Sequence, residues 1–164
     1  MEKGLENKII EKMKDVFEDN KKYIEHTVTV LNYAKEILEK EKGKPDIVIP
    51  AAILHDIGIM ASIEKYDSIA GKYQEIEGPP IAKDILTELG EGENIVKKVA
   101  EIVGSHHSLG EINTKEFDII WDADWLVNLK DEYDISDKIK LEKLIDKIFQ
   151  TPTGKEMAKK IYLK

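Results

Sequence analysis

The chain has 164 residues, of which 41% are hydrophobic and 35% charged, a balance typical of one globular domain with a sizeable core. Its net charge of −8 argues against a general nucleic-acid-binding surface, because such surfaces need basic residues to neutralise phosphates. There is no cysteine, which excludes disulfides and thiolate ligands, and no arginine, so a phosphate site lacks the guanidinium fork. The N-terminus is charged and no unbroken apolar stretch has the length of a membrane helix, so we expect a cytoplasmic protein that binds no membrane.

The first half of the chain shows helical spacing of apolar residues. Residues 2–19 have the pattern of an amphipathic packing helix, which we assign to an N-terminal segment 1–20. A second helix is expected over about 21–42 and carries His26 near its start. A third opens at residues 45–46, runs through an apolar stretch to His55-Asp56, and ends or bends at Gly58.

Residues 61–78 lack clear periodicity, and we expect a loop there with at most a short helical turn. Long loops in compact domains are often functional, which makes Glu75 and Glu77 candidates for the edge of a site. The alternative is that both are ordinary solvated carboxylates. Pro79-Pro80 is expected to start the next helix, since proline suits a first helical turn.

A helix over about 93–105 is expected to deliver His106-His107 at its C-terminal end. Adjacent helical residues point about 100° apart. One histidine can therefore face a site while the other lines its mouth, binds a second metal or caps the helix end.

The apolar segment 117–129 is interrupted by Asp122 and Asp124. Residues two apart do not share a helix face, so we expect one aspartate to reach a site and the other to cap, pair or face solvent. Helices over about 136–149 and on to Tyr162 complete the chain, and strand-like alternation does not persist anywhere. The prediction is an all-α fold, with residues 1–164 forming a single compact multi-helix domain.

The four histidines all lie beside apolar sequence, within or at the end of an expected helix. His55-Asp56 follows the apolar run 47–54, so Asp56 is expected to be partly buried and to need a cation, a metal or hydrogen-bond donors. This distribution points to one site assembled from several helices. Imidazoles together with carboxylates suit a divalent metal in mixed nitrogen and oxygen coordination.

The order H…HD…D along the chain resembles the HD-domain metal-dependent phosphohydrolases. The resemblance runs from about residue 20 to the end of the chain and includes LHDIG, EGPPIAKDIL, IVGSHH, DADWL and FQTPTGKEMAKKIY. It implies that the metal ligands are His26, His55, Asp56 and Asp124. Family members with two metals have additional ligands that His106 and His107 resemble. They also have a further histidine before these two, which Glu75 or Glu77 would have to replace here.

The resemblance also implies a metal-dependent phosphohydrolase of small phosphorylated metabolites, with a nucleotide favoured, acting through a metal-activated water. Asp56, His106 and His107 would take part in catalysis. One divalent ion is favoured and two are an alternative; Mn, Fe, Co, Ni, Zn and Mg all suit the ligands. The alternative functions are a phosphodiesterase and a non-catalytic regulator that binds metal or nucleotide. The expected partner is a small phosphorylated substrate, and the oligomeric state is left open.

Overall fold

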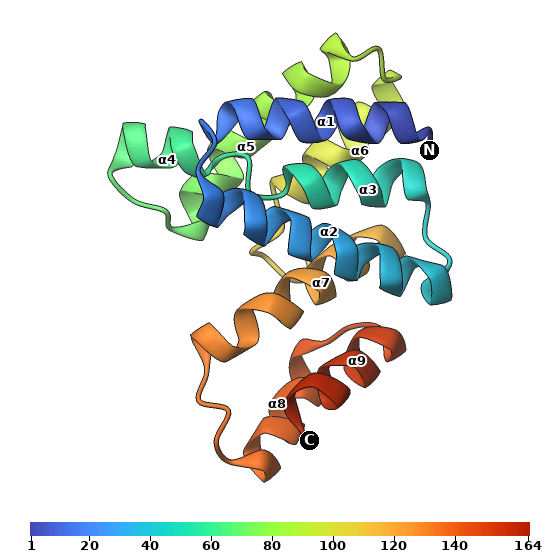
Figure 1. Ribbon diagram of the computed structural model, residues 1–164, viewed down its shortest axis with the longest axis vertical. Coiled ribbons are helices and arrows are strands. Elements are labelled where there is room, and N and C mark those ends of the chain that lie inside the picture. Colours follow the sequence, from blue (N-terminus) through green and yellow to red (C-terminus); the bar gives the residue numbers. More distant parts are fainter.

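The computed structural model describes residues 1–164 and consists of nine α-helices without a strand, which confirms the all-α prediction (Figure 1). The helices are α1 (Lys3–Val16), α2 (Lys21–Glu41), α3 (Pro45–Leu54), α4 (Ile59–Tyr66), α5 (Gly71–Glu88), α6 (Glu93–Val103), α7 (Lys115–Glu132), α8 (Lys138–Ile148) and α9 (Pro152–Tyr162). One apolar core of 33 buried residues draws side chains from every helix.

Helix α3 is the central element of the core. It contacts α1, α2, α6 and α7, and seven of its ten residues are buried. The segment Pro45–Tyr66 contains an 18-residue stretch with a mean hydropathy of 1.6, which is long and apolar enough to cross a membrane, contrary to the expectation from the sequence. Yet 72% of this 18-residue stretch is buried inside the protein, as is usual for a core helix of a globular protein.

Helix α1 packs across α3 and α5 and buries Ile9 and Met13 in the core, followed by Phe17 just after its end. The expected N-terminal packing helix is therefore present. Glu18 and Asp19 adopt left-handed backbone conformations, and Asn20 then caps the next helix by accepting a hydrogen bond from the backbone N–H of Tyr23. This turn positions the start of α2, where His26 lies.

The prediction of a loop over 61–78 is wrong, because α4 and the first two turns of α5 occupy all of it except residues 67–70. Pro79-Pro80 lies inside α5 and does not start it. The buried positions Gln74, Gly78, Ala82 and Ile85 continue with helical spacing through the prolines. Packing of this face against α6 offsets the backbone hydrogen bonds that two prolines remove.

The C-terminal helices extend the fold below α2 in Figure 1, where α7 runs beside α2 and α9 packs against α7 and α8. The Trp121 indole N–H donates to the carbonyl of Ile148 at 3.0 Å. The Tyr162 hydroxyl donates to the carbonyl of Leu126. These two bonds fix the C-terminal ends of α8 and α9 to the helix that carries Asp124.

Candidate metal centre

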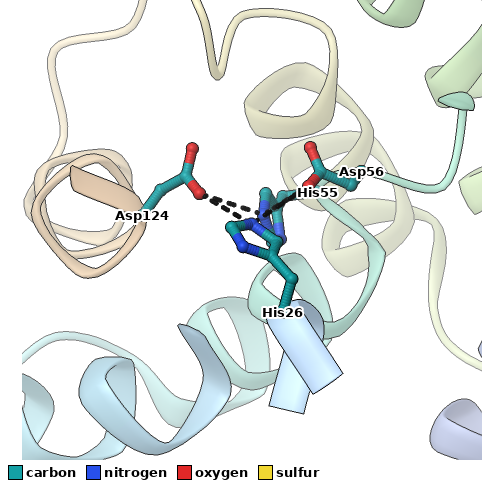
Figure 2. Close-up of side chains that lie close together, drawn as sticks. All are labelled: His26, His55, Asp56 and Asp124. Atoms are coloured by element: carbon teal, nitrogen blue, oxygen red, sulfur yellow. Dashed lines mark hydrogen bonds and ion pairs between the residues drawn. The ribbon is translucent and has the colours of Figure 1, made fainter. Parts of the chain in front are cut away.

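Four side chains from three parts of the fold converge on one point (Figure 2). His26 comes from α2, His55 and Asp56 from the turn after α3, and Asp124 from α7. The Nε2 atom of His26 lies 3.1 Å from Asp124 Oδ1 and 3.2 Å from Asp56 Oδ2, and His55 Nε2 lies 3.2 Å from Asp56 Oδ2. One ligand atom from each residue lies within 4.8 Å of all the others, an arrangement that can hold a metal ion.

Gly58 lets the His55-Asp56 turn approach the backbone of α5. A Cβ added to Gly58 would lie 2.7 Å from the backbone nitrogen of Gly78 and 2.8 Å from the carbonyl oxygen of Gln74. Its backbone is right-handed, so the requirement for glycine is one of space and not of conformation. Gly58, which lies two residues after Asp56, therefore lets α5 pack directly against the turn that carries the His-Asp pair.

The hydrogen bonds of two buried histidines show that the centre needs a cation. The Nδ1 atoms of His55 and His106 each lie 2.7 Å from a backbone carbonyl, which only accepts, so each Nδ1 carries a hydrogen. In the neutral rings, both Nε2 atoms are then acceptors. His55 Nε2 is buried without a hydrogen-bond partner, and His106 Nε2 lies 3.1 Å from an oxygen of Asp56, itself an acceptor. Acceptor atoms that face one another in this way require a metal ion or an added proton between them. Imidazole nitrogens and carboxylate oxygens together suit a divalent metal.

The carboxylates and imidazoles shift each other's pKa values in opposite directions. Burial opposes the charge of His26, but hydrogen bonds to Asp124 and Asp56 outweigh it and raise the pKa of His26 to about 9. Burial likewise opposes charge on His55, and Asp56 and Asp124 raise its pKa well above the usual value. The histidines in turn overcome the effect of burial and lower the pKa values of Asp56 and Asp124. Without a metal, protons on the histidines balance the two carboxylates.

This coupling predicts that chelated protein loses stability as the pH rises. The pKa of His26 is raised on folding. Protonated His26 therefore contributes fully to the stability of the fold below about pH 6.5, and this contribution is lost as the pH rises through about 9. The loss should reach about 3 kcal/mol in the free energy of unfolding. Urea unfolding between pH 6.5 and 9.5, with chelator and with added metal, tests this. We expect a shallower slope with metal, and equal slopes would contradict the assignment.

The family model of the HD domain matches residues 23–148, more than half of the chain. The chain belongs to the HD-domain family. Comparison with curated proteins and with solved structures gave no further match. The matched segment of this HD domain contains all four converging side chains, and it ends before α9 begins.

His106 and His107 lie on the other side of Asp56 in this HD domain. His106 is buried and faces Asp56, whereas His107 is an exposed residue, and the centroids of the two rings lie 4.0 Å apart. Desolvation of the ring and the neighbouring His106 lower the pKa of His107 to about 4, so it is neutral at pH 7. Asp56, His106 and His107 also form a group whose ligand atoms lie within 4.8 Å of one another.

Neither Glu75 nor Glu77 contributes to this second group, contrary to the possibility raised from the sequence. Glu75 accepts hydrogen bonds from the backbone N–H of His107 and the Ser108 hydroxyl, and so caps the turn after α6. Glu77 forms an ion pair with Lys65 at 2.7 Å and does not contact the group. Placing 71–78 in a helix turns both side chains away from the group.

The side chain that does reach His107 from α5 is Gln74, which was not among the residues expected from the sequence. Gln74 is buried, and its Oε1 lies 3.3 Å from His107 Nε2 while its amide nitrogen donates to the carbonyl of Ile69. The four-residue spacing from Gln74 to Gly78 and Ala82 was the available signal. A glutamine offers a neutral oxygen, which is a weaker metal ligand than imidazole for most transition ions.

Asp122 and Asp124 play different parts, as their spacing on one helix requires. Asp124 reaches the centre and accepts a further hydrogen bond from the Asn128 amide at 3.0 Å. Asp122 points the other way and accepts from the backbone N–H groups of Gln150 and Thr151 and from the Thr151 hydroxyl, at 2.7–2.8 Å. Burial raises the pKa of Asp122 to about 6 against these hydrogen bonds. Asp122 therefore anchors the start of α9.

We expect Asp122→Ala to destabilise the fold by about 3 kcal/mol and to leave metal content unchanged. The change leaves the buried donors of Gln150 and Thr151 without their charged acceptor, and each such loss typically costs about 1–3 kcal/mol. Urea unfolding and elemental analysis measure the two effects. Asp118→Ala, one turn earlier on α7 at a half-buried position, is the matched control. A loss below about 1 kcal/mol for Asp122→Ala would show that the anchor is unimportant.

Proposed function

We propose that this HD domain is a metal-dependent phosphohydrolase acting on a small phosphorylated metabolite, with a nucleotide as the favoured substrate. The observation that supports it most directly is the buried cluster of imidazole nitrogens and carboxylate oxygens formed by His26, His55, Asp56 and Asp124 in a chain of this family. Such a cluster is costly to bury without a bound cation. A site that holds a divalent ion next to an open pocket has the elements that phosphate hydrolysis requires.

In this proposal the four residues hold the ion through imidazole nitrogens and carboxylate oxygens, and Mn, Fe, Co, Ni, Zn and Mg all suit the set. When bound, a divalent ion lowers the pKa of its water and polarises a phosphoryl oxygen. His55 keeps a fixed orientation, because its Nδ1–H donates to the carbonyl of Ala52. Asn128 holds Asp124 in the same way through its amide group.

Asp56 is the residue that connects the ligand cluster to the remaining histidines. Its Oδ2 faces His26 and His55, and its Oδ1 lies 3.1 Å from His106 Nε2. A carboxylate with both oxygens engaged in this way is fixed in orientation and can position the attacking water. His106 lies where it can exchange a proton with that water, and His107 lies at the mouth of the pocket, where it can contact a phosphate oxygen or the leaving group.

A panel of phosphomonoesters and phosphodiesters, combined with elemental analysis of protein purified without chelator, tests the proposal. We expect about one divalent ion per chain, phosphomonoester hydrolysis that chelator removes, and recovery of activity on adding metal. Preferential cleavage of diesters would favour the phosphodiesterase. Tight metal binding without turnover of any substrate would favour the non-catalytic regulator. Protein that neither carries nor binds metal would contradict both enzymes and a metal-binding regulator, and would leave only a regulator that binds nucleotide.

A further inference from the structure

A pocket opens beside the metal centre along one face of α7. Its volume is about 170 Å³, and its lining residues are His106, His107, Trp121, Asp124, Trp125, Asn128 and Glu132. The five from α7 lie on one side of the helix because, apart from the adjacent Asp124 and Trp125, successive members are three or four residues apart. Because Asp124 belongs to the centre, a molecule in the pocket has one end at the metal ligands.

The distance between the first and last acidic residues of the pocket lining distinguishes among phosphomonoesters. Asp124 and Glu132 are eight residues apart, which corresponds to about 12 Å along the helix axis. A substrate with its phosphate at the centre must extend about this far to reach Glu132. A short ester such as a glycerol phosphate ends before it, whereas a nucleoside monophosphate has a phosphate at one end and a flat base at the other.

The middle of the pocket is aromatic. Trp125 is half-buried, and its indole N–H makes no hydrogen bond. The centroid of its ring lies 6.2 Å from that of Trp121 and 5.8 Å from that of Tyr133. Trp121 is fixed by its bond to Ile148 and supports Trp125 from the side. Both tryptophans of the chain thus line one pocket, and an indole is a good surface on which a nucleobase stacks.

The charge of the pocket argues against a polyphosphate. No lysine lines the pocket. Two lysines of α5 are directed elsewhere: Lys72 lies over the Tyr73 ring, and Lys83 lines a separate hollow between α5 and α6. At the far end, the Glu132 carboxylate makes neither a hydrogen bond nor an ion pair, and it lies at the helix C-terminus, where the dipole does not favour an anion. A carboxylate in this position is free to accept a hydrogen bond from an amino group.

We propose that this pocket makes the protein selective for nucleoside monophosphates whose base carries an exocyclic amino group. The base stacks on Trp125, and Glu132 accepts a hydrogen bond from the amino group, as cytosine and adenine can supply. A base with a carbonyl in that position would place an acceptor against the carboxylate. The inference depends on the phosphohydrolase proposed above, because it assigns the substrate of the same centre.

Matched substrate pairs test the role of Glu132. We expect kcat/KM to be about tenfold higher for CMP than for UMP and for AMP than for IMP, since each pair differs by an amino group and a carbonyl. CTP should be a poorer substrate than CMP. In Glu132→Gln both preferences should disappear, because an amide can donate as well as accept. Asp131→Asn, the exposed neighbour that does not line the pocket, should keep them.

Tryptophan fluorescence gives a readout that does not depend on turnover. CMP should quench the emission of the unmutated protein, glycerol 2-phosphate should not, and Trp125→Phe should bind CMP better than Trp125→Leu. Tyr66→Leu, an exposed aromatic on α4, is the control. Quenching without hydrolysis of any phosphate would support the pocket and contradict the phosphohydrolase. Hydrolysis with equal rates within each pair, or with CTP preferred, would overturn the pocket assignment alone.

Discussion

Replacing Asp56 with alanine is expected to remove bound metal and to lower phosphate hydrolysis by about a thousandfold or more. Asp56 contacts His26 and His55 through one oxygen and His106 through the other, so it connects three of the histidines of the site. Loss of a ligand removes the stabilisation of transition-state charge that a metal supplies, which is worth several kcal/mol, and about 4 kcal/mol corresponds to a thousandfold.

The Asp56→Ala chain should nevertheless fold. The change removes a buried negative charge together with the need to balance it, and the histidines can then remain neutral. Elemental analysis, kcat/KM for a phosphomonoester and the helical circular dichroism signal separate the two effects. Asp84→Ala, at an exposed position on α5, should leave all three unchanged. Near-normal activity in Asp56→Ala with a folded chain would show that the His-Asp pair is not the catalytic centre.

The two adjacent histidines are expected to differ in their effect on turnover. His106→Ala should lower kcat by about a hundredfold, the size typical for loss of a general acid or base, because His106 is buried against Asp56. His107→Ala should lower it by about tenfold or less, since His107 lies at the exposed mouth of the pocket and bonds to Gln74. In both variants the metal content should stay near one ion per chain.

Metal content also decides between one ion and two. The group formed by Asp56, His106 and His107 has the spacing for a second ion, but the residue next to it on α5 is Gln74, a neutral ligand. This is why we favour a single ion. Two ions in the unmutated protein that fall to one in either histidine variant would overturn that choice. Unchanged turnover in both variants would remove the histidine pair from the site.

Most helices were predictable from the sequence, and the predictions that were wrong, at residues 61–78 and at Pro79-Pro80, have a common cause. Segments with one apolar stripe, such as residues 2–19 and 93–103, fold as their spacing predicts, because each buries that stripe against the core. The error over 61–78 arose where Pro79-Pro80 suggested a helix start. Two prolines inside a helix are unfavourable locally, and only the contact of α5 with α6 makes them acceptable.

The sequence by itself determined the types of ligand available and their order along the chain. With no cysteine and four histidines, any metal had to be held by imidazoles and carboxylates, and the H…HD…D order indicated which family to expect. The apolar run before His55-Asp56 also predicted that the pair would be buried, as it is. These properties follow from composition and local pattern alone.

Only the tertiary structure decided which side chains meet. It directs Asp124 into the centre and Asp122 to the start of α9, places Gln74 rather than Glu75 or Glu77 beside His107, and aligns Trp125 with Glu132 along one pocket. The physical reason is that helix direction and rotation are set by how the apolar faces of nine helices pack together. A shift of one residue on a helix turns a side chain by about 100°, so contacts between helices cannot be read from spacing within each one.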